Sequence, residues 1–169
     1  MLLKLVLMEF VEFLLGGWLK LVIKIRTARK EDEEFIHFNL NNDPGLRDYD
    51  SKEISGEDYP KYWVRGILAD KKGSLALIAE KDRQKAGFLI AHLLEGVRES
   101  ILNNIFVVKE FRNSGVGDRL IKTYESFIRK KKFKLSLCLI NLDNKKAMRF
   151  HEKNGYTGGY DFRFYQKTL

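Results

Sequence analysis

The segment from residue 105 to residue 128 constrains the fold of this chain more than any other. An apolar run, Ile105-Phe106-Val107-Val108, leads into a turn over residues 112–118 that has glycine at positions 115 and 117. A helical pattern follows at once, because apolar residues recur at three- and four-residue steps through Ile128. A strand, a tight glycine turn and a helix start place several backbone N–H groups around one point, with the helix dipole behind them. The segment therefore predicts an α/β arrangement with an anion-binding turn.

The spacing of this turn distinguishes between three phosphate-binding patterns. A P-loop requires lysine directly after the second glycine, where this chain has Asp118. A dinucleotide fingerprint requires a third small residue at the position of Leu120. The pattern R/Q-x-x-G-x-G/A matches Arg112-x-x-Gly115-x-Gly117 without a gap. We expect glycine at 115 and 117 to let the backbone approach a ligand, and the side chains of Arg112 and Ser114 to add to the anion site.

Hydrophobic periodicity and turn-forming residues predict the remaining elements. Strands are expected over residues 22–28, 75–79, 87–94, 101–108, 135–140 and 162–165. Helices are expected over about 31–40, 59–70, 116–132 and 144–154, the last capped by Asp143 or Asn144. The order β-α-α-β-β-β-α-β-α-β predicts an α/β (α+β) fold with a mixed, mostly antiparallel central sheet and helices on both faces. No repeat or linker divides residues 22–169, so we expect a single domain there.

Residues 1–21 form the most apolar stretch of the chain. Lys4, Glu9 and Glu12 interrupt it, which disfavours a membrane span and a signal peptide. We expect an extra apolar helical extension that packs against the domain or, in a homodimer, against a second copy. An upstream extension from a misplaced start is an equal alternative.

Charge and cysteine content narrow the classes of partner. Lysine and arginine total 31 against 23 acidic residues, a net charge of +8, which attracts nucleic acid, anionic lipid or a phosphorylated cofactor. Residues 41–58 are the exception, because six acidic and two basic side chains give this segment a net charge of −4. The one cysteine, Cys138, excludes an internal disulfide framework and a Cys-rich zinc site. It predicts a buried thiol and a reducing, cytoplasmic location.

A second motif gives the chain a family resemblance. The pattern N-x-x-A-x-x-[FL]-Y-x-x-x-G-[FY] is written here as Asn144-x-x-Ala147-x-x-Phe150-His151-x-x-x-Gly155-Tyr156. Together with the glycine turn, it makes the chain resemble the GNAT superfamily of acetyl-CoA-dependent N-acetyltransferases. The resemblance runs from about Ile23 to the C-terminus. Within the family, the Asn104-Ile105-x-Val107 run is most similar to the ribosomal-protein N-terminal acetyltransferases.

The resemblance implies an enzyme that moves the acetyl group of acetyl-CoA to a primary amine by direct attack in a ternary complex, without a metal. In that family, amides near Val107 and Val108 polarise the thioester carbonyl, the turn binds the diphosphate, and Asn144 contacts the cofactor near its pantetheine arm. The cofactor-binding residues implied here are Ile105, Phe106, Val107, Val108, Arg112, Asn113, Ser114, Gly115, Val116, Gly117, Asp118, Asn144, Ala147 and Phe150.

The catalytic side chains depart from the family pattern at two positions. The usual tyrosine acid for the thiolate is His151 here, which could donate a proton as an imidazolium or could simply pack in the helix while the thiolate leaves unassisted. The glutamate base of the N-terminal acetyltransferases falls at Leu139 and is therefore missing. Among Glu99, Glu95 and His92 we expect Glu99 to be the base, because it precedes the strand that presents the cofactor.

The acceptor and the competing functions stay open at this level. The acidic segment 41–58 could draw a cationic amine, or could be a solvated loop, and nearby Tyr49, Tyr59, Tyr62 and Trp63 could line a pocket. A protein N-terminus, a lysine, a polyamine and an antibiotic amine all fit. A CoA-binding regulatory module without catalysis is the main alternative. Nucleic-acid binding through residues 129–134 lacks a supporting motif, so we expect no nucleic-acid or membrane partner.

Overall fold

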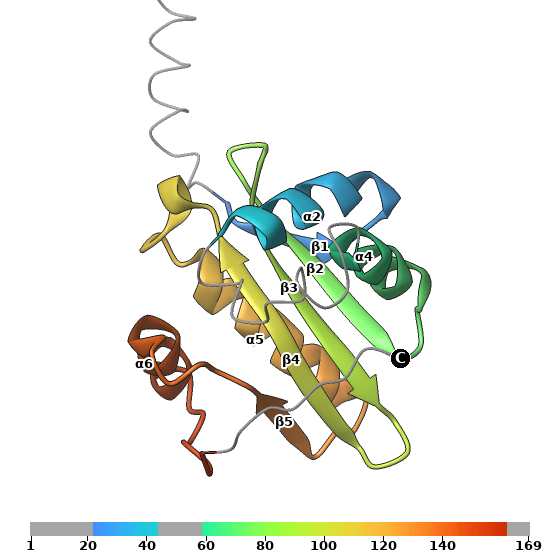
Figure 1. The fold of residues 1–169 in the computed structure, drawn as a ribbon, viewed down its shortest axis with the longest axis vertical. Helices are drawn as coiled ribbons and strands as arrows, with labels where there is room; N and C mark the ends of the chain where they lie inside the picture. The colour runs from blue at the N-terminus through green and yellow to red at the C-terminus, as the bar shows by residue number, and fades with distance from the viewer. Residues whose placement is uncertain (1–21, 44–58, 162–169) are drawn as a thin grey trace, which may run out of the picture.

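A five-stranded mixed sheet forms the centre of the molecule in the computed structural model, which describes residues 22–43 and 59–161 (Figure 1). Its strands are β1 (Lys24–Thr27), β2 (Ser74–Lys81), β3 (Gln84–Leu94), β4 (Glu99–Val107) and β5 (Leu135–Cys138), adjacent in that order. Neighbouring strands from β1 to β4 are antiparallel, and β5 runs parallel to β4. The predicted mixed, mostly antiparallel sheet is confirmed.

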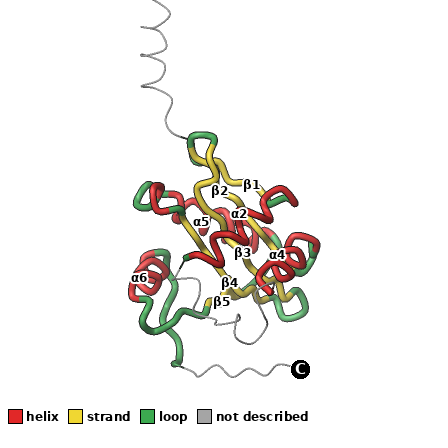
Figure 2. The backbone as a smooth tube through the Cα atoms, turned by 45° about the horizontal axis from the view of Figure 1, so that its top comes forward, coloured by secondary structure: helices red, strands yellow, loops and turns green. Residues whose placement is uncertain are grey.

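Helices cover both faces of this sheet, as expected (Figures 1 and 2). On one face lie α2 (Glu33–Asn42), which follows the short 3-10 helix η1 (Lys30–Asp32), and α4 (Tyr59–Ala69). The opposite face carries α5 (Val116–Lys130), which a second 3-10 helix, η3 (Lys109–Phe111), connects to β4. The last described helix, α6 (Lys145–Lys153), lies beyond the β5 edge. None of the helices within residues 22–43 and 59–161 is long and apolar enough to cross a membrane.

Two apolar clusters hold the layers together, one on each face of the sheet. Leu89 of β3 packs with Leu120 and Tyr124 of α5, all fully buried. On the other face, Phe88 of β3 packs with Ile36 of α2 and with residues of α4. Each large apolar side chain that is removed from water in this way contributes about 1.5–3 kcal/mol. Successive side chains of β3 therefore anchor opposite helical layers.

The β5 strand is less covered than its sequence predicts. It ends at Cys138 rather than at residue 140, and Leu135 and Leu137 remain 46% and 41% exposed. The side chains that face α5 are half-buried, and this burial raises the pKa of the Cys138 thiol. The Cys138 thiol, which was expected to be buried, is therefore only half-buried. The expected strand over 162–165 and the N-terminal extension 1–21 lie outside the described residues.

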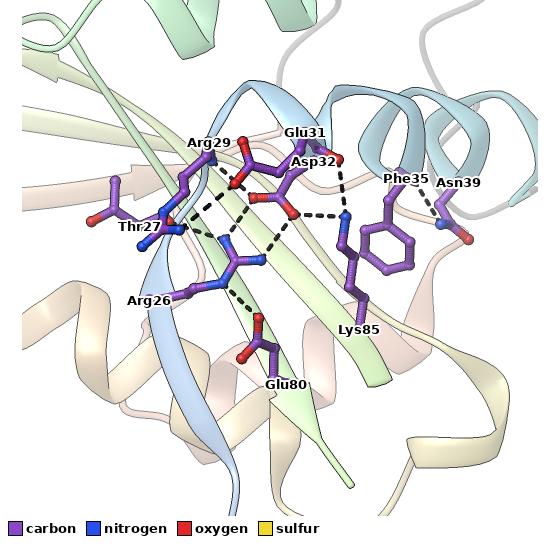
Figure 3. Close-up of polar contacts among 9 residues, drawn as sticks. All are labelled: Arg26, Thr27, Arg29, Glu31, Asp32, Phe35, Asn39, Glu80 and Lys85. Atoms are coloured by element: carbon purple, nitrogen blue, oxygen red, sulfur yellow. Dashed lines mark hydrogen bonds and ion pairs between the residues drawn. The ribbon is translucent and has the colours of Figure 1, made fainter. Parts of the chain in front are cut away.

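A buried charge cluster attaches η1 to the sheet (Figure 3). The side chain of Asp32 is fully buried and accepts hydrogen bonds from Arg26 at 2.6 and 2.9 Å and from the Arg29 amide at 2.9 Å, while Lys85 Nζ lies 2.8 Å away. Arg26 also donates to Glu80 at 2.6 Å. Burial alone would raise the pKa of Asp32, but these donors outweigh it and hold the pKa well below its usual range. The cluster fixes where α2 begins.

Candidate functional site

The outer edge of β4 is open over its second half. The β4–β5 pairing runs from Glu99↔Leu135 to Leu102↔Cys138 and stops, while β4 continues to Val107. Figure 1 accordingly shows β5 beside only one end of β4. Residues 103–107 therefore leave a stretch of roughly 17 Å that no described strand pairs on that side.

The direction of the backbone amides identifies the donors along this edge. The Val108 N–H donates to the Ala86 carbonyl of β3 at 2.9 Å. Because hydrogen-bonding directions alternate along a strand, the amides of Ile105 and Val107 face away from β3, toward the open edge. Of the two amides implied as donors to the thioester, Val108 is thus committed to the sheet. The N–H groups of Val107 and Ile105 both face the open edge.

The glycine turn presents a run of free backbone donors. Asn113 and Gly115 have φ values of 59° and 84°, the left-handed conformation, and α5 begins directly afterwards without a side-chain cap. For the amides of residues 113–118 we find no acceptor among the described residues. Successive amides in such a turn, at the positive end of a helix dipole, form a concave anion site. The order of strand, left-handed glycine and helix start is the one that the sequence predicts.

Two side chains of the turn differ from expectation. The Arg112 guanidinium donates to the Val107 carbonyl and to Asp43 at the end of α2, both at 2.9 Å. The Ser114 hydroxyl donates to the Phe111 carbonyl at 2.7 Å. Both side chains hold the turn in shape, so the donors that remain for a ligand are mainly those of the main chain.

The second motif docks on this turn through α6. Phe150 packs on Gly117 so closely that a Cβ there would lie 3.1 Å from its ring. Asp118 accepts a hydrogen bond from Lys153 at 2.9 Å, and this contact holds the pKa of Asp118 below its usual range. Asn144 caps α6 by accepting from the Ala147 amide at 3.1 Å. The structure thus brings the two motifs together and gives Gly117 a packing role.

A chain of hydroxyls ties β4, α5, β5 and the end of the second motif together. Ser100 and Tyr124 are 2.6 Å apart, Tyr124 and Ser136 2.7 Å, and Ser136 and Tyr156 2.8 Å. Burial raises the pKa of both tyrosines, so these hydroxyls stay protonated. The chain fixes β5 at the closed end of β4.

His151 is buried and neutral. Only 6% of the residue is exposed, its Nδ1 lies 2.9 Å from the Ala147 carbonyl, and the rings of Phe150 and Tyr156 meet it edge-on. A carbonyl oxygen can only accept, so Nδ1 carries the proton. Nε2 is buried without a partner in the described part of the chain, and burial lowers the pKa. An acid role needs an imidazolium that this environment disfavours, which supports the packing alternative.

The three candidate bases lie at different places. Glu99 begins β4, roughly 26 Å along the strand from Val107, and faces the end of the β3–β4 hairpin. Glu95 accepts a hydrogen bond from Lys131 at 3.2 Å. Nδ1 of His92, on β3, lies 2.7 Å from Oδ1 of Asn103, which is the first residue of the open edge. Only His92 is in contact with that edge.

A pocket of about 480 Å³ lies between the end of α2 and the end of β4, lined by Asn39, Asn42, Asp43, Phe106, Val108, Lys109, Glu110 and Arg112. Most of the acidic segment, with Tyr49, lies outside the described residues. Trp63 packs against His92, and Tyr62 is exposed. Within the described ranges, no three His, Cys, Asp or Glu side chains are grouped to hold a metal ion.

Comparisons with known proteins agree with this geometry. The model of the acetyltransferase (GNAT) family matches residues 32–156. An uncharacterised N-acetyltransferase of Archaeoglobus fulgidus is 25% identical over 135 residues, which are 76% of this chain and 89% of the relative. A transcriptional regulator from Bacillus halodurans C-125 superposes with a TM-score of 0.71 at 17% identity, covering 86% of this chain and 100% of that one. An aminoglycoside N-acetyltransferase in complex with CoA gives 0.66 at 22% identity, covering 88% and 96%.

Proposed function

This chain belongs to the GNAT acetyltransferase family, and on that premise we propose that it transfers the acetyl group of acetyl-CoA to a primary amine within a ternary complex. The observation that carries the proposal is the run of amides at residues 113–118, which have no acceptor in the described part of the chain and lie at one end of the open edge of β4. A diphosphate needs such donors, and a pantetheine arm, which contains two amides, can pair with an exposed strand edge. The CoA bound to the aminoglycoside N-acetyltransferase supports the choice of ligand.

The chain's own residues supply binding and polarisation. The turn would hold the diphosphate, while the outward amides of Ile105 and Val107 would pair with the arm and donate to the thioester oxygen as negative charge develops on it. Arg112 supports the edge, because it holds the Val107 carbonyl. Held in place, the neutral amine attacks the carbonyl carbon, the C–S bond breaks, and the thiolate leaves.

The thiolate takes its proton from the attacking nitrogen. That nitrogen becomes positively charged in the tetrahedral intermediate and must lose a proton to form the amide. His151 serves in this scheme as a packing residue, since its one ring proton is engaged by Ala147. The scheme therefore does not need the tyrosine that the family pattern has at this position.

A cationic amine is the acceptor that the charges favour. The net charge of −4 on residues 41–58 would attract it, while the basic remainder attracts the anionic co-substrate. One neighbour in fold is an aminoglycoside N-acetyltransferase, whose substrates are amines of this class. We therefore place polyamines and aminoglycosides before neutral amines as substrates.

A CoA-binding regulatory module is the second candidate. The burial of His151 favours it, because burial lowers the pKa of the imidazole and disfavours the protonated form that an acid needs. Such a module would bind acetyl-CoA at the same turn without releasing CoA.

Two measurements test these proposals. Acetyl-CoA should raise the melting temperature of the protein, and thiol release should follow when spermidine, kanamycin, a lysine-containing peptide or a peptide with a free N-terminus is added. Stabilisation without thiol release would support the regulatory module. No stabilisation by acetyl-CoA would contradict both candidates. Gly115→Val should abolish the stabilisation, with Gly96→Val in the exposed β3–β4 turn as the matched control.

A further inference from the structure

We propose that Nε2 of His92 is the base that takes the proton from the acceptor ammonium, with Asn103 as the residue that positions it. This inference rests on the proposed acetyl transfer and adds a catalytic residue to it. An amine that is protonated at neutral pH has no lone pair for attack, so its proton must be removed first, and a base at the acceptor site accelerates that step.

The position of His92 is set by an irregularity in the sheet. The β3–β4 register shifts between Ile90 and Ala91, which pair with Asn104 and Leu102, so Asn103 is the extra residue of a bulge. Asn103 also follows directly after the last β4–β5 pair. The bulge therefore holds the His92–Asn103 pair at the inner end of the open edge, where the reactive end of an arm extending from the glycine turn would arrive.

The hydrogen bond to Asn103 selects the useful tautomer. Oδ1 of Asn103 lies 2.7 Å from Nδ1 of His92, and an amide oxygen can only accept. Nδ1 therefore carries the proton of the neutral ring, and Nε2 carries the lone pair. No hydrogen bond to Nε2 occurs in the described part of the chain. The residue is half-buried, which leaves that nitrogen open to a substrate.

The surroundings hold the ring and suit the charge it would acquire. The Trp63 ring of α4 packs against it edge-on, with centroids 6.1 Å apart. Asp70 lies just after α4, and its pKa is lowered mainly by the Gly73 amide, then by the Lys72 amide and least by the charge of His92. Asp70 thus stays ionised and would stabilise an imidazolium. Asn103 and Trp63 do not titrate near neutral pH.

The other two histidines lack this combination. Nε2 of His37, on α2, lies 2.8 Å from the side-chain amide nitrogen of Asn41, so the nitrogen that corresponds to the proposed base is already engaged. The free nitrogen of His151 is buried away from solvent. His37, which is half-buried on α2, on a different element from the open edge, is therefore a suitable control for loss of a histidine.

The proton balance of the step is simple. Nε2 takes one proton from the ammonium, which leaves a neutral amine and an imidazolium. The amine attacks, and its second proton goes to the departing thiolate, which gives the amide and free CoA. The imidazolium then returns its proton to water, and the enzyme is regenerated.

His92→Gln should lower kcat with spermidine or kanamycin by roughly 100- to 10,000-fold near neutral pH, the usual contribution of a general base. The acetyl-CoA-dependent rise in melting temperature should be kept, and His37→Gln should match the wild type. The defect should shrink as the pH approaches the pKa of the acceptor amine, where free amine is supplied by solvent. Added imidazole should restore part of the rate in His92→Ala.

Several outcomes would overturn the proposal. If the wild type releases thiol and His92→Gln keeps this rate within twofold, His92 is not the base, although the proposed acetyl transfer still stands. A defect that is equal at all pH values, without rescue by imidazole, would make His92 a structural residue. An ¹⁵N spectrum showing the Nε2–H tautomer in the wild-type protein would contradict it even if the variants failed to fold. No thiol release by the wild type with any amine of the panel would overturn it together with the proposed function.

Discussion

Gly115→Ala tests whether the conformation of one residue holds the anion site open. The residue has φ of 84°, and a Cβ added there would meet only Ile23 Cδ1, at 3.8 Å. The substitution therefore causes no clash, and its cost is the left-handed backbone conformation itself, about 1–2 kcal/mol for an alanine. For a chain of this size, that corresponds to a fall in melting temperature of about 2–8 °C.

The same substitution should weaken acetyl-CoA binding. A residue that relaxes toward negative φ turns its neighbouring amides away from the common point, and a hydrogen bond to a charged group is worth about 1.5–3 kcal/mol. Loss of one such bond raises the Kd by roughly 10- to 150-fold. Isothermal titration calorimetry with acetyl-CoA, together with thermal unfolding, measures both effects on one sample.

The matched control is Gly96→Ala. Gly96 lies in the β3–β4 turn, has open space around its α-carbon and is not in the left-handed conformation. It should therefore keep both the melting temperature and the Kd. If Gly115→Ala lost stability but bound acetyl-CoA as the wild type does, the amides of the turn would not be the ligands of the diphosphate.

Three further predictions concern buried polar groups. Asp32→Asn should cost about 3–5 kcal/mol in urea denaturation at pH 7, because Arg26 loses its buried partner. Since the native pKa of Asp32 lies below the unfolded value of about 3.9, the wild type loses this stability as the pH falls, and the difference in the free energy of unfolding between wild type and variant should shrink below pH 4. A difference that does not depend on pH would contradict this reasoning. Tyr124→Phe should cost about 1–3 kcal/mol, because Ser100 loses its hydroxyl partner, and an unchanged unfolding midpoint would contradict the buried chain. His151→Phe should keep kcat. The wild type should lose stability below about pH 6.5, since burial lowers the native pKa of His151 and the unfolded state takes up the proton first, and the variant should lack this loss. A lower kcat in a stable variant would support the acid role of His151.

Local sequence signals predicted the parts of the site that are built from consecutive residues. The glycine turn follows from the steric freedom of Gly115, and the start of α6 follows from the capping preference of Asn144. Helix α5 follows from its apolar repeat. In each case the physical cause lies within a few residues of its effect.

Contacts between residues that are distant in the sequence could not be predicted from it. Glu99 is the first residue of β4, so the direction of the strand places it at the far end from Val107 and from the open edge. The sequence predicted Arg112 as an anion ligand. It could not show the ion pair with Asp43, because that residue lies 69 positions away. The pairing of His92 with Asn103 depends on a one-residue shift of register, and a bulge leaves no regular pattern in the sequence.

The site therefore divides into a main-chain part and a side-chain part, and this explains how the family motif can tolerate the changes seen here. In the proposed reaction, binding of the diphosphate and polarisation of the thioester require amides, which every residue type except proline supplies, so only the glycine geometry must be kept. Proton removal requires one side chain near the acceptor, and any strand that borders the open edge of β4 can provide it. A chain that has leucine at position 139, where the pattern of the N-terminal acetyltransferases that it resembles has a glutamate, can accordingly keep the proposed chemistry if a neighbouring strand supplies the base, and the base that we propose, His92, lies on β3.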